Sequence, residues 1–149
     1  MASLEFEQRI AAPPALVSAF FVPQRMAYWY GAEMNCELEV LGGASDFAVG
    51  QKIRITGKLG AREISLTAVV EKFEFGRILE WKFQDAYGVK GAQAWTIVAA
   101  GDATLVRMRD AYEMPGAFGR MFDRLFTRHA VARRDREWLA RLQRLAERR

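Results

Sequence analysis

Apolar positions in the last part of the chain recur at the spacing of an α-helix. From Pro115 to Arg149 they lie three and four residues apart, which is the period of one helix face. This face carries Phe118, Met121, Phe122, Leu125, Phe126 and His129, then a charged interval, then Trp138, Leu139, Leu142 and Leu145. A continuous helix of about 31 residues would be roughly 45 Å long. Such a helix needs a large apolar partner, since it would not be stable alone in water.

Upstream of this segment the pattern changes to the period of two that half-buried strands show. Leu4, Phe6, Gln8 and Ile10 alternate with charged residues and predict the first strand. Further strands are predicted at 34–40, 52–57, 64–75, 78–84, 91–99 and 104–114, separated by turns that contain glycine or aspartate.

Prolines divide the region between the first two predicted strands. Pro13 and Pro14 end the first strand, and residues 15–22 and 24–30 predict two short helices separated by Pro23. The order is one strand, two short helices, about six antiparallel strands and one long helix. This order predicts an α+β fold, a curved antiparallel sheet with its helices on one side, in a single domain of residues 1–149.

Composition narrows the class of protein. The chain has 149 residues, of which half are hydrophobic, so it is long enough to bury a sizeable core. It has no apolar run of 18 residues, and its N-terminus lacks a basic segment followed by an apolar one. Both observations disfavour membrane spanning and secretion, and we expect a cytoplasmic protein. The lone Cys36 excludes an internal disulfide, and its alternation with Met34 and Leu38 indicates a small buried hydrophobe.

The net charge of +4 is unevenly distributed. From Gly116 onward there are ten arginines and four acidic residues, a net charge of +6, so the preceding residues sum to −2. A basic helix is one sign of nucleic-acid binding. Here, however, the arginines are interleaved with acids, as on an ordinary solvated helix face. The sequence therefore disfavours a nucleic-acid partner.

Several stretches together resemble one known superfamily. They are residues 10–21 (IAAPPALVSAFF), 49–52 (VGQK), 68–81 (AVVEKFEFGRILEW), 95–98 (WTIV), 101–106 (GDATLV) and 112–116 (YEMPG). In their order and spacing they look like the polyketide cyclase/dehydrase branch of the START-like (SRPBCC) superfamily. The resemblance implies a helix-grip fold (START/Bet v 1-like), in which about seven antiparallel strands wrap around a long C-terminal helix and enclose a cavity. Members bind or transfer lipids, bind hormones, cyclise polyketides or assist chaperones, so the resemblance implies a pocket without fixing a reaction.

Strand alternation, read with the strand orientation of that superfamily, predicts the lining of the cavity. The strands would contribute Leu79, Trp81, Phe83, Gln93, Trp95, Ile97, Val106, Met108, Asp110 and Tyr112; the long helix would add Met121, Phe122 and Leu125, and Trp29 would close the mouth. A mostly apolar lining with a few polar groups is typical of a small-molecule site. The same residues would also serve as a plain hydrophobic core.

Three residues are candidates for proton transfer. Asp110 lies on the predicted inward face, where an unpaired carboxylate is costly, so it either pairs with an arginine or hydroxyl, such as Tyr112, or has a raised pKa and acts as an acid or base. A register error that places Asp110 outside is the structural alternative. His129, the only histidine, would act as a base or orient a ligand carbonyl; alternatively it packs against a strand edge.

Three functional hypotheses follow from these observations. The first is a binder of a hydrophobic small molecule, lipid or aromatic polyketide-like, in the cavity. The second is a polyketide cyclase/dehydrase-type enzyme that uses Asp110, Tyr112 or His129. The third, weaker hypothesis is a protein-interaction module that uses the arginine-rich helix end or a strand edge. One histidine and one cysteine cannot form a usual zinc site, and no phosphate-binding loop or Gly-x-Ser-x-Gly motif occurs. We therefore expect no metal and no cofactor, and the sequence is compatible with a homodimer.

Overall fold

A seven-stranded antiparallel sheet forms the body of the protein. The structure is a computed structural model that describes residues 2–122 and 126–148, apart from the side chains of Leu59, Arg62 and Phe122. The strand order is β1-β7-β6-β5-β4-β3-β2, so only β1 lies out of chain order. The strands are β1 Ala2–Ile10, β2 Glu37–Val40, β3 Lys52–Leu59, β4 Arg62–Glu74, β5 Ile78–Asp85, β6 Lys90–Ala100 and β7 Ala103–Glu113.

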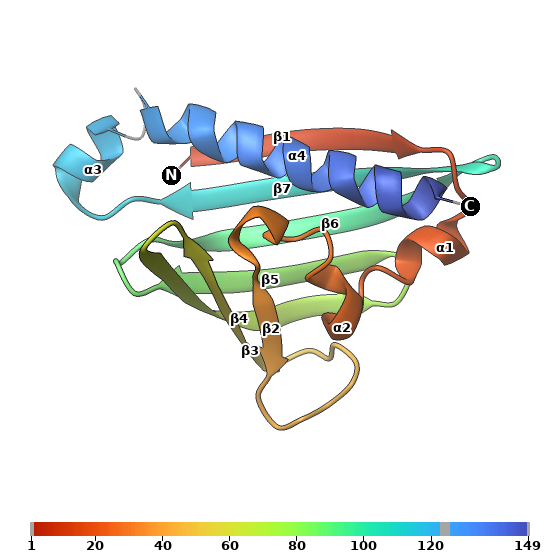
Figure 1. The fold of residues 1–149 in the computed structure, drawn as a ribbon, viewed down its shortest axis with the longest axis horizontal. Coiled ribbons are helices and arrows are strands. Elements are labelled where there is room, and N and C mark those ends of the chain that lie inside the picture. The colour runs from red at the N-terminus through yellow and green to blue at the C-terminus, as the bar shows by residue number, and fades with distance from the viewer. Residues whose placement is uncertain (1, 123–125, 149) are drawn as a thin grey trace.

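The helices of the described residues lie toward one face of the sheet or at its ends. They are α1 Pro14–Ser18, α2 Pro23–Met26, the 3₁₀ helix η1 Ala32–Met34, α3 Gly116–Phe122 and α4 Arg128–Glu147. The helix α4 crosses the face of the sheet near β1 and β7, with α1 and α2 at one end and α3 at the other (Figure 1). This is the predicted helix-grip architecture: seven antiparallel strands, two short helices after the first strand and a long C-terminal helix.

Alternation along β7 shows which side chains face α4. Met108, Asp110 and Tyr112 are each 3% exposed or less, whereas Arg107 and Arg109 between them are exposed. We call the face that carries the buried set the inner face. On this face, Asp110, Gln93 and Trp81 form one row across β7, β6 and β5. The neighbouring row, toward α3, consists of Tyr112, Gly91 and Phe83.

The long C-terminal helix is confirmed as α4, but the apolar face predicted from Pro115 to Arg149 does not belong to this helix alone. The structure has two helices that run in different directions, α3 and α4 (Figure 1). In the second half the apolar stripe is confirmed, because Trp138, Leu139 and Leu142 are each buried. In the first half, Phe118 and Met121 on α3 are 75% and 53% exposed. Periodicity identified a helical face, but it could not show that α3 lies beyond the end of the sheet, where less of the protein covers it.

The predicted strand at 34–40 is shorter in the structure. Its first residue belongs to η1, and Asn35 after it adopts a left-handed backbone conformation with φ of 50°. This turn separates η1 from β2, which begins only at Glu37. Burial still follows the predicted alternation, since Met34, Cys36 and Val40 are all buried. Residues 34–40 therefore show the alternating burial of a strand, although only residues 37–40 form one.

Candidate functional site

Aromatic side chains fill much of the space between the sheet and α4. All four tryptophans, Trp29, Trp81, Trp95 and Trp138, are 2% exposed or less. Edge-to-face contacts join three of them, with ring centroids 5.1 Å apart for Trp81 and Trp95 and 6.0 Å apart for Trp29 and Trp95. Such contacts add to the stability gained from burial alone. This part of the predicted cavity lining is therefore packed core.

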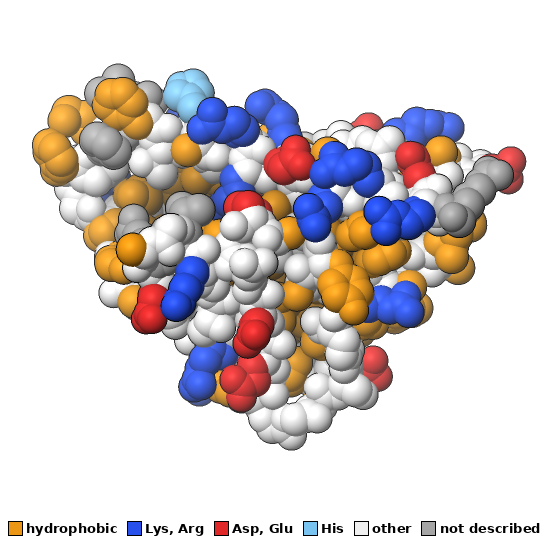
Figure 2. Space-filling model, viewed as in Figure 1, with side chains coloured by type: hydrophobic (Ala, Val, Ile, Leu, Met, Phe, Trp, Pro, Cys, Tyr) orange, Lys and Arg blue, Asp and Glu red, His pale blue; other side chains and the backbone are white. Residues whose placement is uncertain are grey.

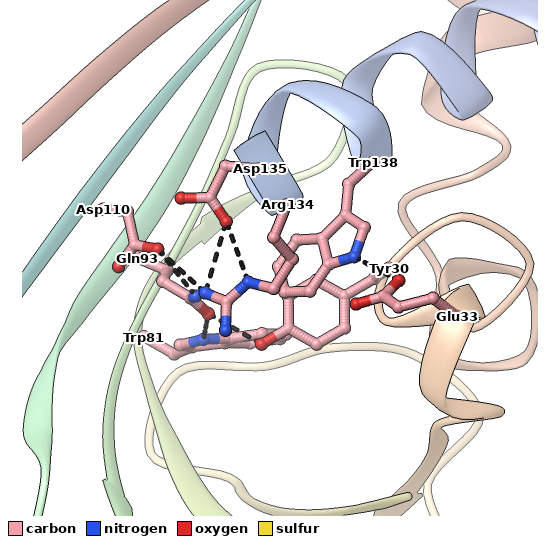
Figure 3. Close-up of polar contacts among 8 residues, drawn as sticks. All are labelled: Tyr30, Glu33, Trp81, Gln93, Asp110, Arg134, Asp135 and Trp138. Atoms are coloured by element: carbon pink, nitrogen blue, oxygen red, sulfur yellow. Dashed lines mark hydrogen bonds and ion pairs between the residues drawn. The ribbon is translucent and has the colours of Figure 1, made fainter. Parts of the chain in front are cut away.

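A polar cluster lies beside these rings, where α4 crosses the inner face (Figure 3). Arg134 on α4 donates through Nη2 to Asp110 Oδ2 on β7, at 3.3 Å, and to Asp135 Oδ1, also at 3.3 Å. Its Nε donates to the same Asp135 oxygen at 3.3 Å. Asp110 and Asp135 are 1% and 0% exposed, so both carboxyl groups are taken fully out of water. We refer to Arg134, Asp110 and Asp135 as the Arg134 cluster.

A neutral hydrogen-bond chain extends the Arg134 cluster across the sheet. Gln93 Nε2 lies 3.4 Å from Asp110 Oδ2. Gln93 Oε1 accepts from the Tyr30 hydroxyl at 2.8 Å and from Trp81 Nε1 at 3.0 Å. Each of these side chains is buried, so the bonds satisfy groups that would otherwise be costly to bury. The result is that the cluster's surroundings are held in a fixed arrangement by β5, β6, β7 and the loop after α2.

The other side of Arg134 is aromatic. The guanidinium carbon lies 4.4 Å from the ring centroid of Trp138, a cation–π distance. The Tyr30 ring lies 4.4 Å from the same tryptophan ring, and Trp138 Nε1 donates to Glu33 Oε2 at 2.8 Å. Two carboxyl groups therefore fix the edge of the guanidinium group, and the Trp138 ring covers its face. Even so, 34% of the Arg134 side chain remains exposed.

Burial sets the protonation of the Arg134 cluster. Loss of hydration, together with a hydrogen bond to Asp110, raises the pKa of Asp135 to about 9, although the charge of Arg134 opposes the rise. Asp110 Oδ1 and Asp135 Oδ2 are buried with no hydrogen-bond donor among the described residues, so burial of these two oxygens is uncompensated. Burial lowers the pKa of Arg134, but the two carboxyl groups outweigh it and the pKa is raised. Burial likewise raises the pKa of Tyr30, and Asp135 keeps its proton at pH 7.

We expect the protein to lose stability as the pH rises from about 4 to about 9. Asp135 ionises near 3.8 in an unfolded chain but near 9 in the folded protein. Between these values the folded state holds one more proton, so raising the pH favours unfolding by at most about 1.4 kcal/mol per pH unit. Urea midpoints at several pH values should show the decline.

The substitution Asp135→Asn should remove this contribution, because an amide does not titrate. The difference between wild type and variant should therefore grow in favour of the variant as the pH rises. Glu137→Gln, at an exposed residue two positions along α4, is the matched control and should keep the wild-type pH dependence. Parallel pH profiles for wild type and Asp135→Asn would contradict the raised pKa.

The inner face is less tightly covered on the α3 side of the cluster. Ile64, Leu66 and Phe83 point to the inner face but are only half-buried. In the row next to Asp110, Gly91 lies between Tyr112 and Phe83 and contributes no side chain. This apolar surface therefore begins one row from Asp110, the partner of Arg134 on β7. Two depressions, of 450 and 310 Å³, lie on the opposite face of the sheet, lined by residues that include Thr67, Lys82 and Gln84.

Of the candidate acid–base residues, Asp110 and Tyr112 share the inner face in adjacent rows, whereas His129 does not lie there. Asp110 pairs with an arginine, which is one of the two alternatives the sequence left open. Tyr112 is buried on the inner face in the neighbouring row. His129 is exposed in the first turn of α4, where Figure 2 shows it at the surface, so its predicted place on the inward side of the helix is corrected. It takes no part in the hydrogen bonds of the Arg134 cluster.

The predicted ligand-binding residues divide into three groups. Trp81, Phe83 and Gln93 adjoin the cluster or its half-covered side. The closed core contains Trp29, Leu79, Trp95, Ile97 and Met108. Met121 is exposed on α3, because that helix lies beyond the sheet. The side chain of Phe122 and the whole of Leu125 lie outside the described residues.

Sequence reasoning missed Arg134, Asp135 and Tyr30. Arg134 and Asp135 occur in the charged interval 133–137, which is typical of a solvated helix face. One signal was present: Asp135 precedes Trp138, Leu139 and Leu142 by three, four and seven residues, so it extends the buried stripe by one turn. A carboxylate in line with such a stripe indicates a buried partner.

Two further properties concern only the described part of the chain. None of its helices is both long enough and apolar enough to cross a membrane. It also contains no group of three or more histidine, cysteine, aspartate or glutamate residues placed to hold a metal ion.

The helix-grip fold recurs in solved structures of low sequence identity. Protein CV1439 from Chromobacterium violaceum superimposes with a TM-score of 0.73 at 14% identity, over 100% of both chains. Ara h 8.0201 has a TM-score of 0.71 at 9% identity, over 97% of both chains. DynU16, encoded in the dynemicin biosynthetic locus, has a TM-score of 0.71 at 19% identity, over 97% of this chain and 47% of its own.

Fold and sequence together define the class. The protein is a helix-grip protein of the START-like (SRPBCC) type. More narrowly, residues 1–147 match the model of the family described as polyketide cyclase/dehydrase and lipid transport, and the chain belongs to that family. No curated protein sequence matches the chain.

Proposed function

We propose that the protein binds a largely apolar small molecule with at least one polar group, on the inner face of the sheet beside α4. The observation that carries this proposal is that Arg134 is fixed in place but only partly engaged by the protein. Its Nε and Nη2 are held by buried carboxyl groups, while Nη1 makes no observed hydrogen bond to the described residues and a third of the side chain is exposed. A fixed donor at the edge of apolar surface is typical of small-molecule sites.

The surroundings of Arg134 support an apolar body for the ligand. Phe83, Leu66 and Ile64 offer half-buried apolar surface, and Gly91 leaves the adjacent row without a side chain between Phe83 and Tyr112. Covering this surface with an apolar molecule would contribute about 25 cal/mol for each Å² removed from water. The family description, which includes both polyketide cyclases and lipid transport, agrees with a ligand of this kind.

Native mass spectrometry of protein purified from its own host, followed by extraction, tests the proposal directly. We expect an apolar adduct at one per chain. An uncharged carbonyl dye such as Nile red gives an independent measurement, because its emission increases in apolar surroundings. Absence of both an adduct and saturable dye binding would contradict the proposal.

Arg134→Lys should weaken dye binding by about tenfold, or about 1.4 kcal/mol. Lysine keeps the charge but loses the planar fork that bonds two carboxyl groups and stacks on Trp138. Arg144→Lys is the matched control on the same helix, since Arg144 pairs only with the exposed Glu137 in the described structure. Equal loss in both variants, or loss in neither, would show that Arg134 does not contact the dye.

A cyclase/dehydrase-type enzyme is the second candidate function. It is favoured by Asp135, which burial and Asp110 keep protonated at pH 7 and which could therefore give a proton to a bound carbonyl oxygen. Asp110 would then be its partner, with Tyr112 in the neighbouring row. Mass analysis of the extracted molecule before and after incubation with fresh protein distinguishes the two: a binder returns it unchanged, whereas an enzyme converts it.

A further inference from the structure

The charges around Arg134 restrict what it can bind. Arg134 carries the positive charge of the Arg134 cluster, and the Asp110 carboxylate lies 3.3 Å from it in an ion pair. Asp135 is protonated and adds no charge, so the cluster is neutral. If Asp135 were ionised, the cluster would carry a charge of −1. In neither state does a positive charge remain to balance an anionic ligand.

Among the described residues, the groups that act on Tyr30 beside the cluster do not supply a further positive charge. The ionisable groups that act on Tyr30, which packs on Trp138 beside Arg134, are Arg134, Asp110, Asp135 and Cys36. Among the described residues Arg134 is therefore the only cation of this set. Glu33, which bonds Trp138 Nε1, adds an acidic group on the far side of that ring. Elsewhere on α4, Arg141 bonds the Tyr28 carbonyl and Arg144 bonds Glu137. Arg128, two turns before Asp135 on the same helix, is likewise engaged in an interaction of its own.

From this balance we infer that the molecule bound beside Arg134 is uncharged at its polar end, with a carbonyl or hydroxyl oxygen as acceptor, and that carboxylates and phosphates are excluded. The inference rests on the proposed function and names its ligand class. An anion placed there would lose hydration next to apolar surface without gaining a free countercharge, which is strongly unfavourable. A ketone, ester or phenol oxygen needs only the hydrogen bond that Arg134 Nη1 has available. Free fatty acids and phospholipid headgroups would then be poor ligands.

The test uses pairs of probes that share one apolar body and end in either a neutral carbonyl group or a carboxylate. We would titrate the full-length protein at pH 7 with 2-acetylnaphthalene against 2-naphthoate, and with dodecanamide against dodecanoate, by isothermal calorimetry. We expect the neutral member to bind at least about tenfold more tightly in each pair that fits. Equal or tighter binding of the carboxylate would overturn the inference while leaving the proposed function intact. If no member of either pair binds up to its solubility limit, the result would count against both the inference and the proposed function.

A change of charge in the cluster should change this selectivity. The double substitution Asp110→Asn with Asp135→Asn leaves the Arg134 charge unmatched, and the preference for the neutral probe should fall at least about tenfold or reverse. Glu137→Gln changes the net charge of α4 at an exposed position and should leave the preference as it is. An unchanged preference in a folded double variant would show that the cluster's charge is not the cause. The wild-type titration decides the inference even if the double variant does not fold.

Discussion

Replacing Trp81 by alanine is expected to cost about 4 kcal/mol of unfolding free energy, the middle of the range for truncating a fully buried aromatic side chain. Trp81 is fully buried and contacts Trp95, Tyr30 and Phe47 through its ring. Truncation removes these contacts and leaves a void that the other rigid rings cannot fill. Urea unfolding followed by circular dichroism measures the loss.

The expected loss has a polar component as well. Trp81 Nε1 is one of two donors to Gln93 Oε1, and Tyr30 is the other. Trp81→Phe keeps most of the ring but removes this bond, so it should cost less than the alanine variant, about 1–2 kcal/mol. Phe75→Ala, at an aromatic residue that is 61% exposed, is the control and should change stability by less than about 0.5 kcal/mol. Comparable losses at positions 75 and 81 would contradict the assignment of Trp81 to the core.

The sheet could be predicted from the sequence because successive side chains of a strand point to opposite faces, so the side chains on one face are buried together. On β7 the sequence alternates Val106, Met108 and Asp110 with arginines, and the structure buries the first set against α4 while the arginines stay exposed. A period of two leaves only two choices of inner face, and the apolar majority decides between them. The inward position of Asp110 followed from its neighbours, although its own chemistry argues for the surface.

The candidate site was less accessible to this reasoning. Arg134 comes from α4 and Asp110 from β7, and no local pattern states which residue of a helix lies over which residue of a strand. The placement depends on how the whole helix packs. On α3 the same limit led to the opposite error, since Phe118 and Met121 have helical spacing but are exposed. Spacing determines which residues share a face, whereas tertiary packing determines what covers that face.

The Arg134 cluster also makes a strong prediction about stability. Arg134→Met is expected to lower the unfolding free energy by about 3 kcal/mol at pH 7, toward the lower end of the range for breaking a buried ion pair. Methionine keeps a similar apolar length, so most of the loss comes from the Asp110 carboxylate, which remains buried without its partner. The partial exposure of Arg134 limits the effect, because water can reach part of the vacated position.

The triple variant Arg134→Met, Asp110→Asn, Asp135→Asn separates lost charge pairing from lost packing. It has no unpaired charge in the Arg134 cluster, so it should recover more than half of the stability that Arg134→Met loses. The single variant should also lose further stability between pH 6 and pH 8, because the folded protein holds the Asp135 proton that the unfolded chain has lost, whereas the triple variant has no Asp135 and should not. If instead both variants are equally unstable at every pH, Arg134 contributes mainly through its stacking on Trp138. That outcome would mean that Arg134 stabilises the protein through its contact with the Trp138 ring, and not through its pairing with Asp110 and Asp135.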